Sequence, residues 1–207
     1  YFPNFFVEEE GGADFGWFHK KAAKEINSNS DIFAVLEWPR EHAKSVFSDI
    51  FEPLYLKAKG EVSGMVIASQ SGDKAKGLLA DIQAQLESNQ RYINDFGEQY
   101  NWGSWSEKHF VTKDGVGFWA IGRRESPRGL REAEKRPNLL IIDDLDDDEE
   151  VKNEELVKKS LDWLRGALIG AMAIKQRRII MVGNRIAKKS ILAKLAKEYS
   201  DLAIAGR

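Results

Sequence analysis

The sequence predicts an α/β fold with a mostly parallel central sheet flanked by helices on both faces. Two observations indicate this class. Short apolar runs of strand type alternate along the chain with longer segments in which apolar residues recur every three or four positions. The 207 residues, of which 43% are hydrophobic, are enough to form one well-packed core.

The first elements alternate between helices and strands. Apolar residues of Trp17–Ile26 fall on one helical face, which predicts a short helix. Ile32–Leu36 is an apolar run of strand type that leads directly into a helix over Lys44–Lys57. Gly64–Ser69 is a second short strand, and a polar turn separates it from a long helix with one apolar stripe over about Asp73–Glu87.

The second half continues the alternation. His109–Thr112 and Gly117–Ile121 flank an Asp-Gly turn, which predicts a β-hairpin. Asn138–Ile142 is a further strand, and an acidic stretch separates it from a helix over about Val151–Ile174. The stretches RRIIMVGN and AKKSILAKLAKEY then predict a last strand and a last helix.

The composition argues against several classes of protein. No apolar run approaches the roughly 20 residues that span a bilayer, so we expect no membrane association. The chain has no cysteine, which excludes disulfides and thiolate metal sites. Its net charge of −2 provides no general attraction for nucleic acid, so such a contact needs a local basic patch. Because the sequence starts at Tyr1 without a methionine, we expect a piece of a longer protein.

Chemically unusual stretches follow three of the predicted strands, after Leu36, after Ile142 and after Val182. In a parallel sheet, ligands bind beyond the carboxyl ends of the strands. These three stretches are therefore expected to lie near one functional site.

The first stretch, WPREHAKS, ends like the phosphate-binding loop G-x-x-x-x-G-K-[S/T]. Lys44 and Ser45 match the lysine and the hydroxyl that meet phosphates and magnesium. Trp38 and Ala43 replace the two glycines, which allow positive φ and a close backbone approach to phosphate. Arg40 is placed to reach phosphate oxygens from within the loop. Taken alone, Ala-Lys-Ser also fits an ordinary helix start.

The second stretch, NLLIIDDLDDDEE, ends a strand with paired acids. In a magnesium–nucleotide site, one such acid holds the metal and the next polarises the attacking water. We assign Asp143 to the first role and Asp144 to the second. Asp144 is one methylene shorter than the glutamate of many phosphate-loop ATPases, which leaves Glu149 open for that role. Asp146–Asp148 are expected to form a solvated turn whose charges favour the next helix.

The third stretch ends its strand with Gly183 and Asn184. The position of Asn184 fits a side chain that senses a terminal phosphate, and equally fits one that only turns the chain.

An arginine-rich segment, GRRESPRGLREAEKRP at 122–137, precedes the acidic strand. Arg128 and Arg131 are candidates for an arginine finger, which stabilises charge on a transferred phosphoryl group. A basic loop of this kind also suits a DNA backbone. We expect the other three arginines of this segment, Arg123, Arg124 and Arg136, to be merely solvated.

Taken in order, these stretches resemble a known family. WPREHAKS, VIASQSGDKAKGLLADIQAQLESNQRYINDFG, SPRGLREAEKRPNLLIIDDLDDDEE and VGNR follow one another. This series is similar to the ATPase domain of the large terminase subunit, the DNA-packaging motor of tailed bacteriophages and prophages. The lead-in YFPNFF, with FH further on, resembles the family's segment before the phosphate loop, near where adenine lies. The resemblance covers almost the whole chain.

The resemblance implies a P-loop NTPase fold of the ASCE type. It implies a lead-in over residues 1–30 that packs on the core near the adenine site, and an ATPase core over residues 31–207. By this match the Mg²⁺ ligands are Ser45 and Asp143. The residues expected to bind ATP are Trp38, Pro39, Arg40, Glu41, His42, Ala43, Lys44, Ser45 and Val46. The residues expected to act in catalysis are Lys44, Asp144, Arg40, Arg131, Arg128 and Asn184.

The function implied is a motor that hydrolyses ATP with Mg²⁺ and drives double-stranded DNA into a procapsid. The implied partners are the portal protein, the small terminase subunit and further copies in a ring, with this chain alone a monomer. The implied location is the cytoplasm of the bacterial host and, transiently, the procapsid portal. No second carboxylate cluster follows Asn184, so we expect no nuclease domain and no DNA cleavage by this chain. The alternative is a P-loop relic that binds DNA or partner proteins without hydrolysis, because the loop glycines are missing.

Overall fold

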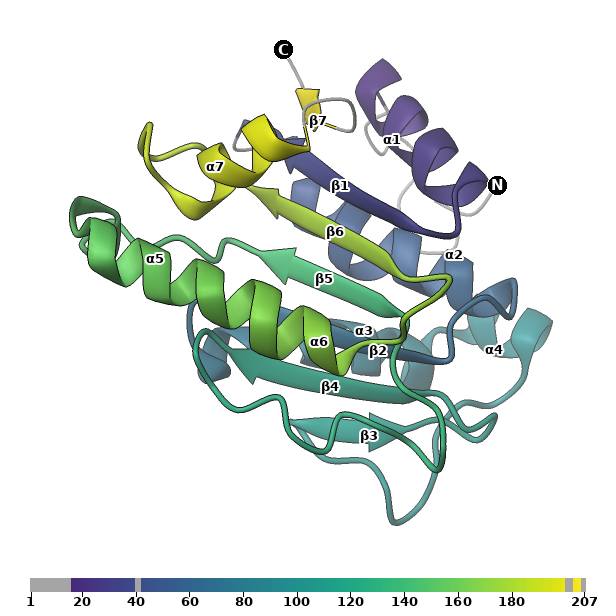
Figure 1. Cartoon of the computed structure of the whole chain (residues 1–207). Helices are drawn as coiled ribbons and strands as arrows, with labels where there is room; N and C mark the ends of the chain where they lie inside the picture. Colours follow the sequence, from purple (N-terminus) through teal and green to yellow (C-terminus); the bar gives the residue numbers. More distant parts are fainter. Residues whose placement is uncertain (1–15, 40–41, 200–202, 206–207) are drawn as a thin grey trace.

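The computed structural model of the chain describes residues 16–39, 42–199 and 203–205, which form a sheet between two helical layers (Figure 1). The strands are β1 (Ile32–Glu37), β2 (Gly64–Ser69), β3 (His109–Val111), β4 (Gly117–Gly122), β5 (Leu139–Asp143), β6 (Arg178–Gly183) and β7 (Ala203–Ala205). Their order in the sheet is β3-β4-β2-β5-β6-β1-β7. Among these strands only β3 runs antiparallel to its neighbour, β4. The predicted α/β class with a mostly parallel sheet is confirmed.

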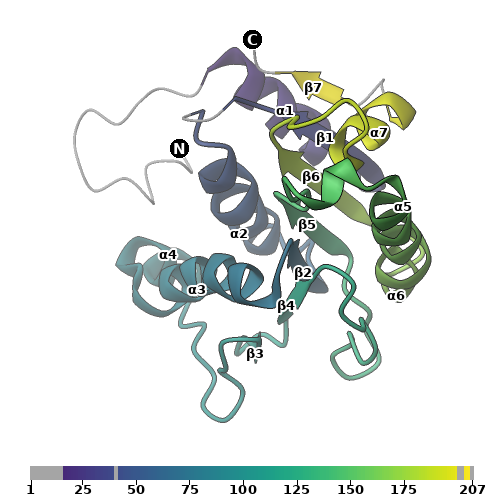
Figure 2. The same ribbon diagram turned by 90° about the vertical axis from the view of Figure 1, so that its left-hand side faces the viewer.

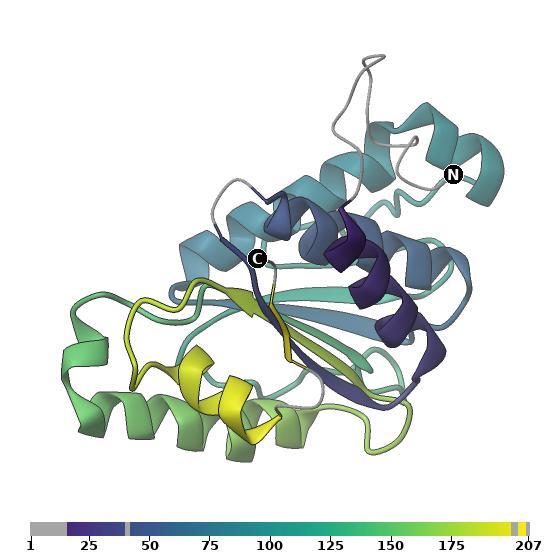
Figure 3. The same ribbon diagram turned by 90° about the horizontal axis from the view of Figure 1, so that it is seen from above.

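Helices cover both faces of the sheet, as the two rotated views show (Figures 2 and 3). One layer contains α1 (Trp17–Ser28), the π-helical turn η2 (Val46–Phe51), α2 (Glu52–Ala58), α3 (Gly72–Ser88) and α4 (Gln90–Phe96). The other contains the 3-10 turn η3 (Glu150–Lys152), α5 (Glu154–Asp162), the π-helical turn η4 (Trp163–Leu168), α6 (Ile169–Ala171) and α7 (Ile191–Glu198). None of the helices in the described part of the chain has both the length and the hydrophobicity that a bilayer span requires.

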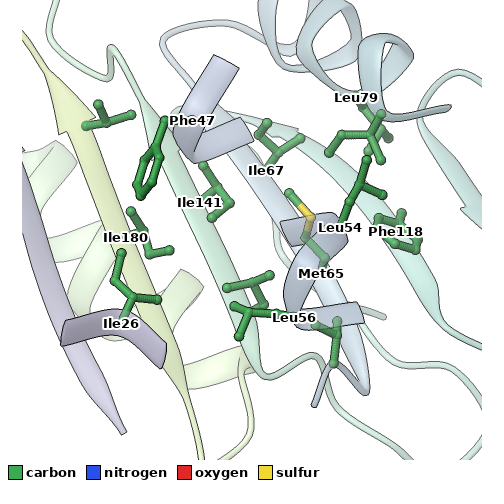
Figure 4. Packing of buried hydrophobic residues seen from close by; sticks show 14 of the residues in the cluster. Ile26, Phe47, Leu54, Leu56, Met65, Ile67, Leu79, Phe118, Ile141 and Ile180 are labelled. Carbon is green, nitrogen blue, oxygen red and sulfur yellow. The ribbon is translucent and has the colours of Figure 1, made fainter. Parts of the chain in front are cut away.

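The strands β1, β2, β4, β5 and β6 send alternate side chains into two separate hydrophobic cores. In β1, Ala34 and Leu36 face the layer of α1, α2 and α3, whereas Phe33 and Val35 face the layer of α5 and α7. Figure 4 shows the first core, in which Leu54 and Leu79 pack against the sheet. Because both faces of the sheet are buried, the polar residues of β1, β2, β5 and β6 lie at the ends of these strands.

Some predicted boundaries differ because side-chain caps decide where helices begin. The helix predicted over Val151–Ile174 has a 3-10 turn first, and α5 begins after Asn153, whose Oδ1 accepts from the backbone N–H of Glu155 at 3.0 Å. The last helix begins at Ile191, where Ser190 is the N-cap. The helix α4 and the strand β7 were not predicted.

A buried polar cluster anchors α1, the described part of the predicted lead-in. Arg178 Nε donates to the carbonyl of Ile26 at 3.0 Å, and Asn27 Nδ2 donates to Glu52 Oε1 at 2.7 Å. Burial raises the pKa of Glu52 to about 8. The rest of the lead-in, residues 1–15, lies outside the described residues.

Candidate functional site

The three chemically unusual stretches emerge at one edge of the sheet. The strand β6 lies between β1 and β5, with Glu37 paired to Gly183 and Asp143 paired to Val182. The arrowheads of β1, β6 and β5 all point to this edge in Figure 1. The loop that begins at Trp38 therefore shares an edge with the paired acids and Asn184, as the sequence predicts.

Lys44 and Ser45 meet the two acids of β5 directly. Lys44 Nζ donates to both oxygens of Asp144, at 2.7 and 2.8 Å, and lies 4.0 Å from Oδ1 of Asp143. Ser45 Oγ donates to Asp143 Oδ2 at 3.1 Å. These contacts join residues about 100 positions apart in the sequence. The ammonium group of Lys44 and the hydroxyl of Ser45 therefore meet two carboxylates at the start of one helix.

Ala43 adopts the backbone conformation for which the phosphate-loop motif uses glycine. Its φ is +50°, in the left-handed region that disfavours side chains. The helix follows at once, since the N–H of Phe47 bonds to the carbonyl of Ala43 at 2.9 Å. A residue with positive φ therefore precedes Lys44, at the position of the motif's second glycine, and in this chain it is an alanine.

Replacing Ala43 with glycine is expected to raise the free energy of unfolding by up to about 1.5 kcal/mol. Relief of the left-handed strain, roughly 1–2 kcal/mol, outweighs the entropy that glycine loses on folding, about 0.5–1 kcal/mol. Urea unfolding measures the change. The control is Ala84→Gly in the middle of α3, an ordinary helical position where glycine costs about 1 kcal/mol. Equal destabilisation by both variants would contradict the strain at Ala43.

The other loop residues differ in what they offer to a ligand. The side chain of Trp38 is buried, only 1% exposed, so its ring belongs to the core and is not available to a nucleotide. Pro39 and Val46 are exposed, and His42 is partly exposed. Arg40 and Glu41 lie outside the described residues.

Buried His19 of α1 connects the lead-in to this loop. Its Nδ1 accepts from the N–H of Gly16 at 3.1 Å, so the ring hydrogen is on Nε2, which donates to the carbonyl of His42 at 2.9 Å. Burial lowers the pKa of His19, which favours this neutral form. Phe18 and His19 both pack on Trp38, with ring centroids 5.0 and 4.8 Å apart from it. The described part of the lead-in thus packs against the loop that begins at Trp38 and supports it.

A third carboxyl group, Asp49, lies next to Asp143 and was not predicted. Asp49 is 2% exposed, and its Oδ1 accepts from Ser48 Oγ at 2.7 Å. Burial raises the pKa of Asp49 well above its usual range, and the charge of Asp143 raises it further. Burial, and then the charge of Asp144, also raises the pKa of Asp143. A signal was present in the sequence, since Asp49 follows Ser45 by four positions and thus shares its helical face.

A cavity of about 360 Å³ lies beside Asp144 and Asn184. Asp144 has a left-handed backbone, φ +42°, which aspartate tolerates better than most residues. Gly183 makes room for it, because a Cβ at that position would lie 3.2 Å from Asp144 Oδ1. Gln70 and Lys74, which follow β2, also line this cavity and were not predicted. The cavity thus brings together Asp144 and Asn184, two of the site residues that the sequence predicts.

Part of the acidic turn was predicted wrongly as merely solvated. Asp146 caps α7, since its two oxygens accept from the N–H groups of Ile191 and Leu192 at 2.7 and 3.0 Å. Asp147 Oδ1 accepts from the N–H of Glu150 at 3.2 Å, which does favour the following turn. These carboxylates therefore fix the loop around the cavity.

The predicted solvation of Arg123 is also wrong. Its side chain is 7% exposed, and Nη1 donates to the carbonyl of Leu145 at 3.0 Å while Nη2 pairs with Glu150 at 2.9 Å. Arg124 Nη2 joins the same carboxylate at 2.6 Å. These arginines hold the acidic turn in place. Arg136 is exposed, as predicted, although its Nη1 donates to the carbonyl of Gly170 at 3.2 Å.

Arg128 and Arg131 are exposed and line a different hollow. This groove, of about 840 Å³, lies between the arginine-rich segment and the helical stretch around Gly166 and Gly170. It shares no lining residue with the cavity beside Asp144. The structure therefore does not bring the two arginines to the paired acids of the same chain.

The residues at the loop suit the groups that the resemblance implies. Lys44, with Ala43 in a left-handed turn before it, suits a phosphate, which would take Lys44 Nζ from Asp144. Asp143 Oδ1 and Asp49 Oδ2 are buried without a hydrogen-bond donor, as expected where a hard cation binds oxygen ligands. Within the described residues, no group of three or more His, Cys, Asp or Glu gathers as a metal cluster. A cation held by Ser45 and Asp143 would also need oxygens from outside the protein.

No protein-family model matches the chain, and no curated protein sequence matches it. Function therefore has to be argued from the site.

Proposed function

We propose that this chain is an ATP-binding and ATP-hydrolysing domain of the P-loop NTPase class, ASCE type. One observation carries the proposal: Lys44 and Ser45 begin a helix after a left-handed residue and contact both acids at the end of β5. The strand order supports it, because β6 is an additional strand between the loop strand β1 and the acidic strand β5.

In this proposal each side chain acts on a different part of the nucleotide. Lys44 exchanges the carboxylate of Asp144 for phosphate oxygens and neutralises their charge. Ser45 and Asp143 hold Mg²⁺, which when bound neutralises charge on the terminal phosphates. Asp144, released from Lys44, accepts a hydrogen from the attacking water in the cavity that it shares with Asn184. Asn184, which directly follows β6 and lines the same cavity, contacts the terminal phosphate.

We further propose that this chain is the motor domain of a large terminase subunit. The order of motifs along the chain supports this assignment. In that role the chain translocates double-stranded DNA as a ring at the procapsid portal, in the host cytoplasm, with the portal protein and the small terminase subunit. Arg128 or Arg131 acts on a neighbouring copy, and neither lines the cavity beside the acids of its own chain. DNA cleavage is not part of the proposal.

A second candidate function is a P-loop relic that binds DNA or partner proteins without hydrolysing ATP. It is favoured by the two residues at the glycine positions, since Trp38 is locked in the core and Ala43 is strained. The two candidates differ in whether Lys44 binds nucleotide.

Thermal unfolding with and without Mg²⁺ and a slowly hydrolysed ATP analogue tests the proposal. At a hundred times the dissociation constant, a ligand of the folded state stabilises by about 2.7 kcal/mol. For a chain of this size that corresponds to a rise of roughly 5–10 °C in Tm. We expect this shift in the parent and in Lys158→Ala, an exposed lysine of α5, and its loss in Lys44→Ala. An equal shift in Lys44→Ala, or none in the parent, would favour the relic.

A further inference from the structure

Asp49 is a buried acid with no structural requirement for its charge. It lies in η2, where the N–H of Glu52 bonds to the carbonyl of Phe47, five residues back, in the wider π-helical pattern. Such π-helical turns are frequent at functional sites. No described cation forms an ion pair with Asp49, although burying an unpaired carboxylate is costly. The carboxyl group therefore needs another explanation.

The contacts of Asp49 point toward Asp143. Oδ1 of Asp49 accepts a hydrogen bond from Ser48 Oγ, whereas Oδ2 of Asp49 is buried and has no hydrogen-bond donor. Oδ1 of Asp143 is likewise buried without a donor. Asp49 lies about one helical turn after Ser45, on the same face, and Ser45 contacts Asp143, so the two carboxyl groups are neighbours. The hydroxyl of Ser45 donates to the other oxygen of Asp143, Oδ2, at 3.1 Å. Three oxygen-bearing side chains thus converge at the start of this helix.

We propose that Asp49 is a second carboxylate of the divalent-cation site and that, with Ser45 and Asp143, it lets the chain bind the cation before nucleotide arrives. A site with only Ser45 and Asp143 depends on phosphate oxygens for further negative charge. A second buried carboxylate supplies charge from the protein, and the affinity of a site for a hard cation rises with the number of charged ligands. The cation would take the two buried oxygens that have no hydrogen-bond donor, Oδ1 of Asp143 and Oδ2 of Asp49. This inference deepens the proposed function and rests on the same site.

Binding of Mn²⁺ alone, followed by its paramagnetic resonance signal at constant pH, tests the proposal without nucleotide. We expect the parent to bind one Mn²⁺ ion and Asp49→Asn to bind it 10- to 100-fold more weakly, a range typical for the loss of a group that supports a metal. Asparagine keeps the shape of the side chain and an oxygen for Ser48, so the fold is expected to persist. Asp49→Ser, which removes the carboxylate and leaves a small polar group, is the second variant. Circular dichroism verifies that each variant is folded.

The matched control is Glu52→Gln, which alters another buried acid three positions along, bonded to Asn27. Its Mn²⁺ affinity is expected to equal that of the parent. Absence of Mn²⁺ binding by the parent, or unchanged affinity in both folded Asp49 variants, would overturn the role of Asp49. Binding of the ATP analogue in the presence of EDTA, measured on the same proteins, separates this result from a failure of the proposed nucleotide site.

Discussion

Asparagine in place of Asp144 is expected to lower the rate of ATP hydrolysis by about 10²- to 10⁴-fold, the usual contribution of a general base. Nucleotide binding should persist or become tighter in this variant. The reason is the pair that Asp144 forms with Lys44, at 2.7 and 2.8 Å, which a phosphate has to displace. Once the carboxylate charge of Asp144 is lost, Lys44 is more readily available to bind phosphate. Steady-state hydrolysis and equilibrium binding of an ATP analogue separate the two effects.

The matched control for this prediction is Glu149→Gln. Glu149 was the alternative for orienting the attacking water, yet its side chain is 83% exposed and pairs with Lys152 at 2.8 Å. It is also not among the residues that line the cavity of Asp144 and Asn184. We therefore expect Glu149→Gln to hydrolyse ATP at the parental rate. The opposite pattern, with a normal rate in Asp144→Asn and a large loss in Glu149→Gln, would transfer the role to Glu149.

Removal of the finger arginine is expected to lower hydrolysis by the assembled protein by roughly 10³- to 10⁵-fold. Either Arg128→Ala or Arg131→Ala should show this loss, because both side chains are exposed and line a groove separate from the acids of their own chain. The isolated monomer, which lacks a neighbour, should hydrolyse slowly and be insensitive to either change. Hydrolysis measured over a range of protein concentrations covers both states.

Mixing two inactive variants gives a sharper test of action on a neighbour. A Lys44→Ala subunit retains its arginines, and a subunit without the finger arginine retains its nucleotide site. The mixture should therefore regain part of the activity under assembling conditions. Arg136→Ala is the matched control, since this arginine lines the same groove but donates to the carbonyl of Gly170. A monomer that already turns over at the assembled rate would contradict the finger in trans.

The parts of the fold that local sequence patterns govern were predictable. Apolar runs and stripes located the strands β1–β6 and most helices, because burial on both faces of a parallel sheet leaves few polar residues within a strand. The convergence of Lys44 with Asp143 and Asp144 also followed, since parallel strands bring their carboxyl ends to one edge. The need for positive φ at Ala43 came from the role of glycine in the motif.

Features that depend on distant contacts were not predictable in the same way. Asp146 caps a helix that begins 45 positions later, and Arg123 reaches a carbonyl 22 positions away. Both looked like solvated charges, because composition alone does not reveal a partner brought near by the fold. The π-helical turn η2 and the burial of Asp49 likewise depend on how the helix packs on β5. The periodicity of the sequence carries no signal for a single wider turn.

A crystal structure of the chain with Mg²⁺ and a slowly hydrolysed ATP analogue tests the nucleotide site most directly. We predict phosphate oxygens at hydrogen-bonding distance from Lys44 Nζ, with the 2.7 and 2.8 Å bonds to Asp144 broken and Asp144 turned toward the terminal phosphate. A structure at saturating analogue in which Lys44 still holds both oxygens of Asp144, with the nucleotide elsewhere or absent, would contradict the assignment of this loop as a phosphate site.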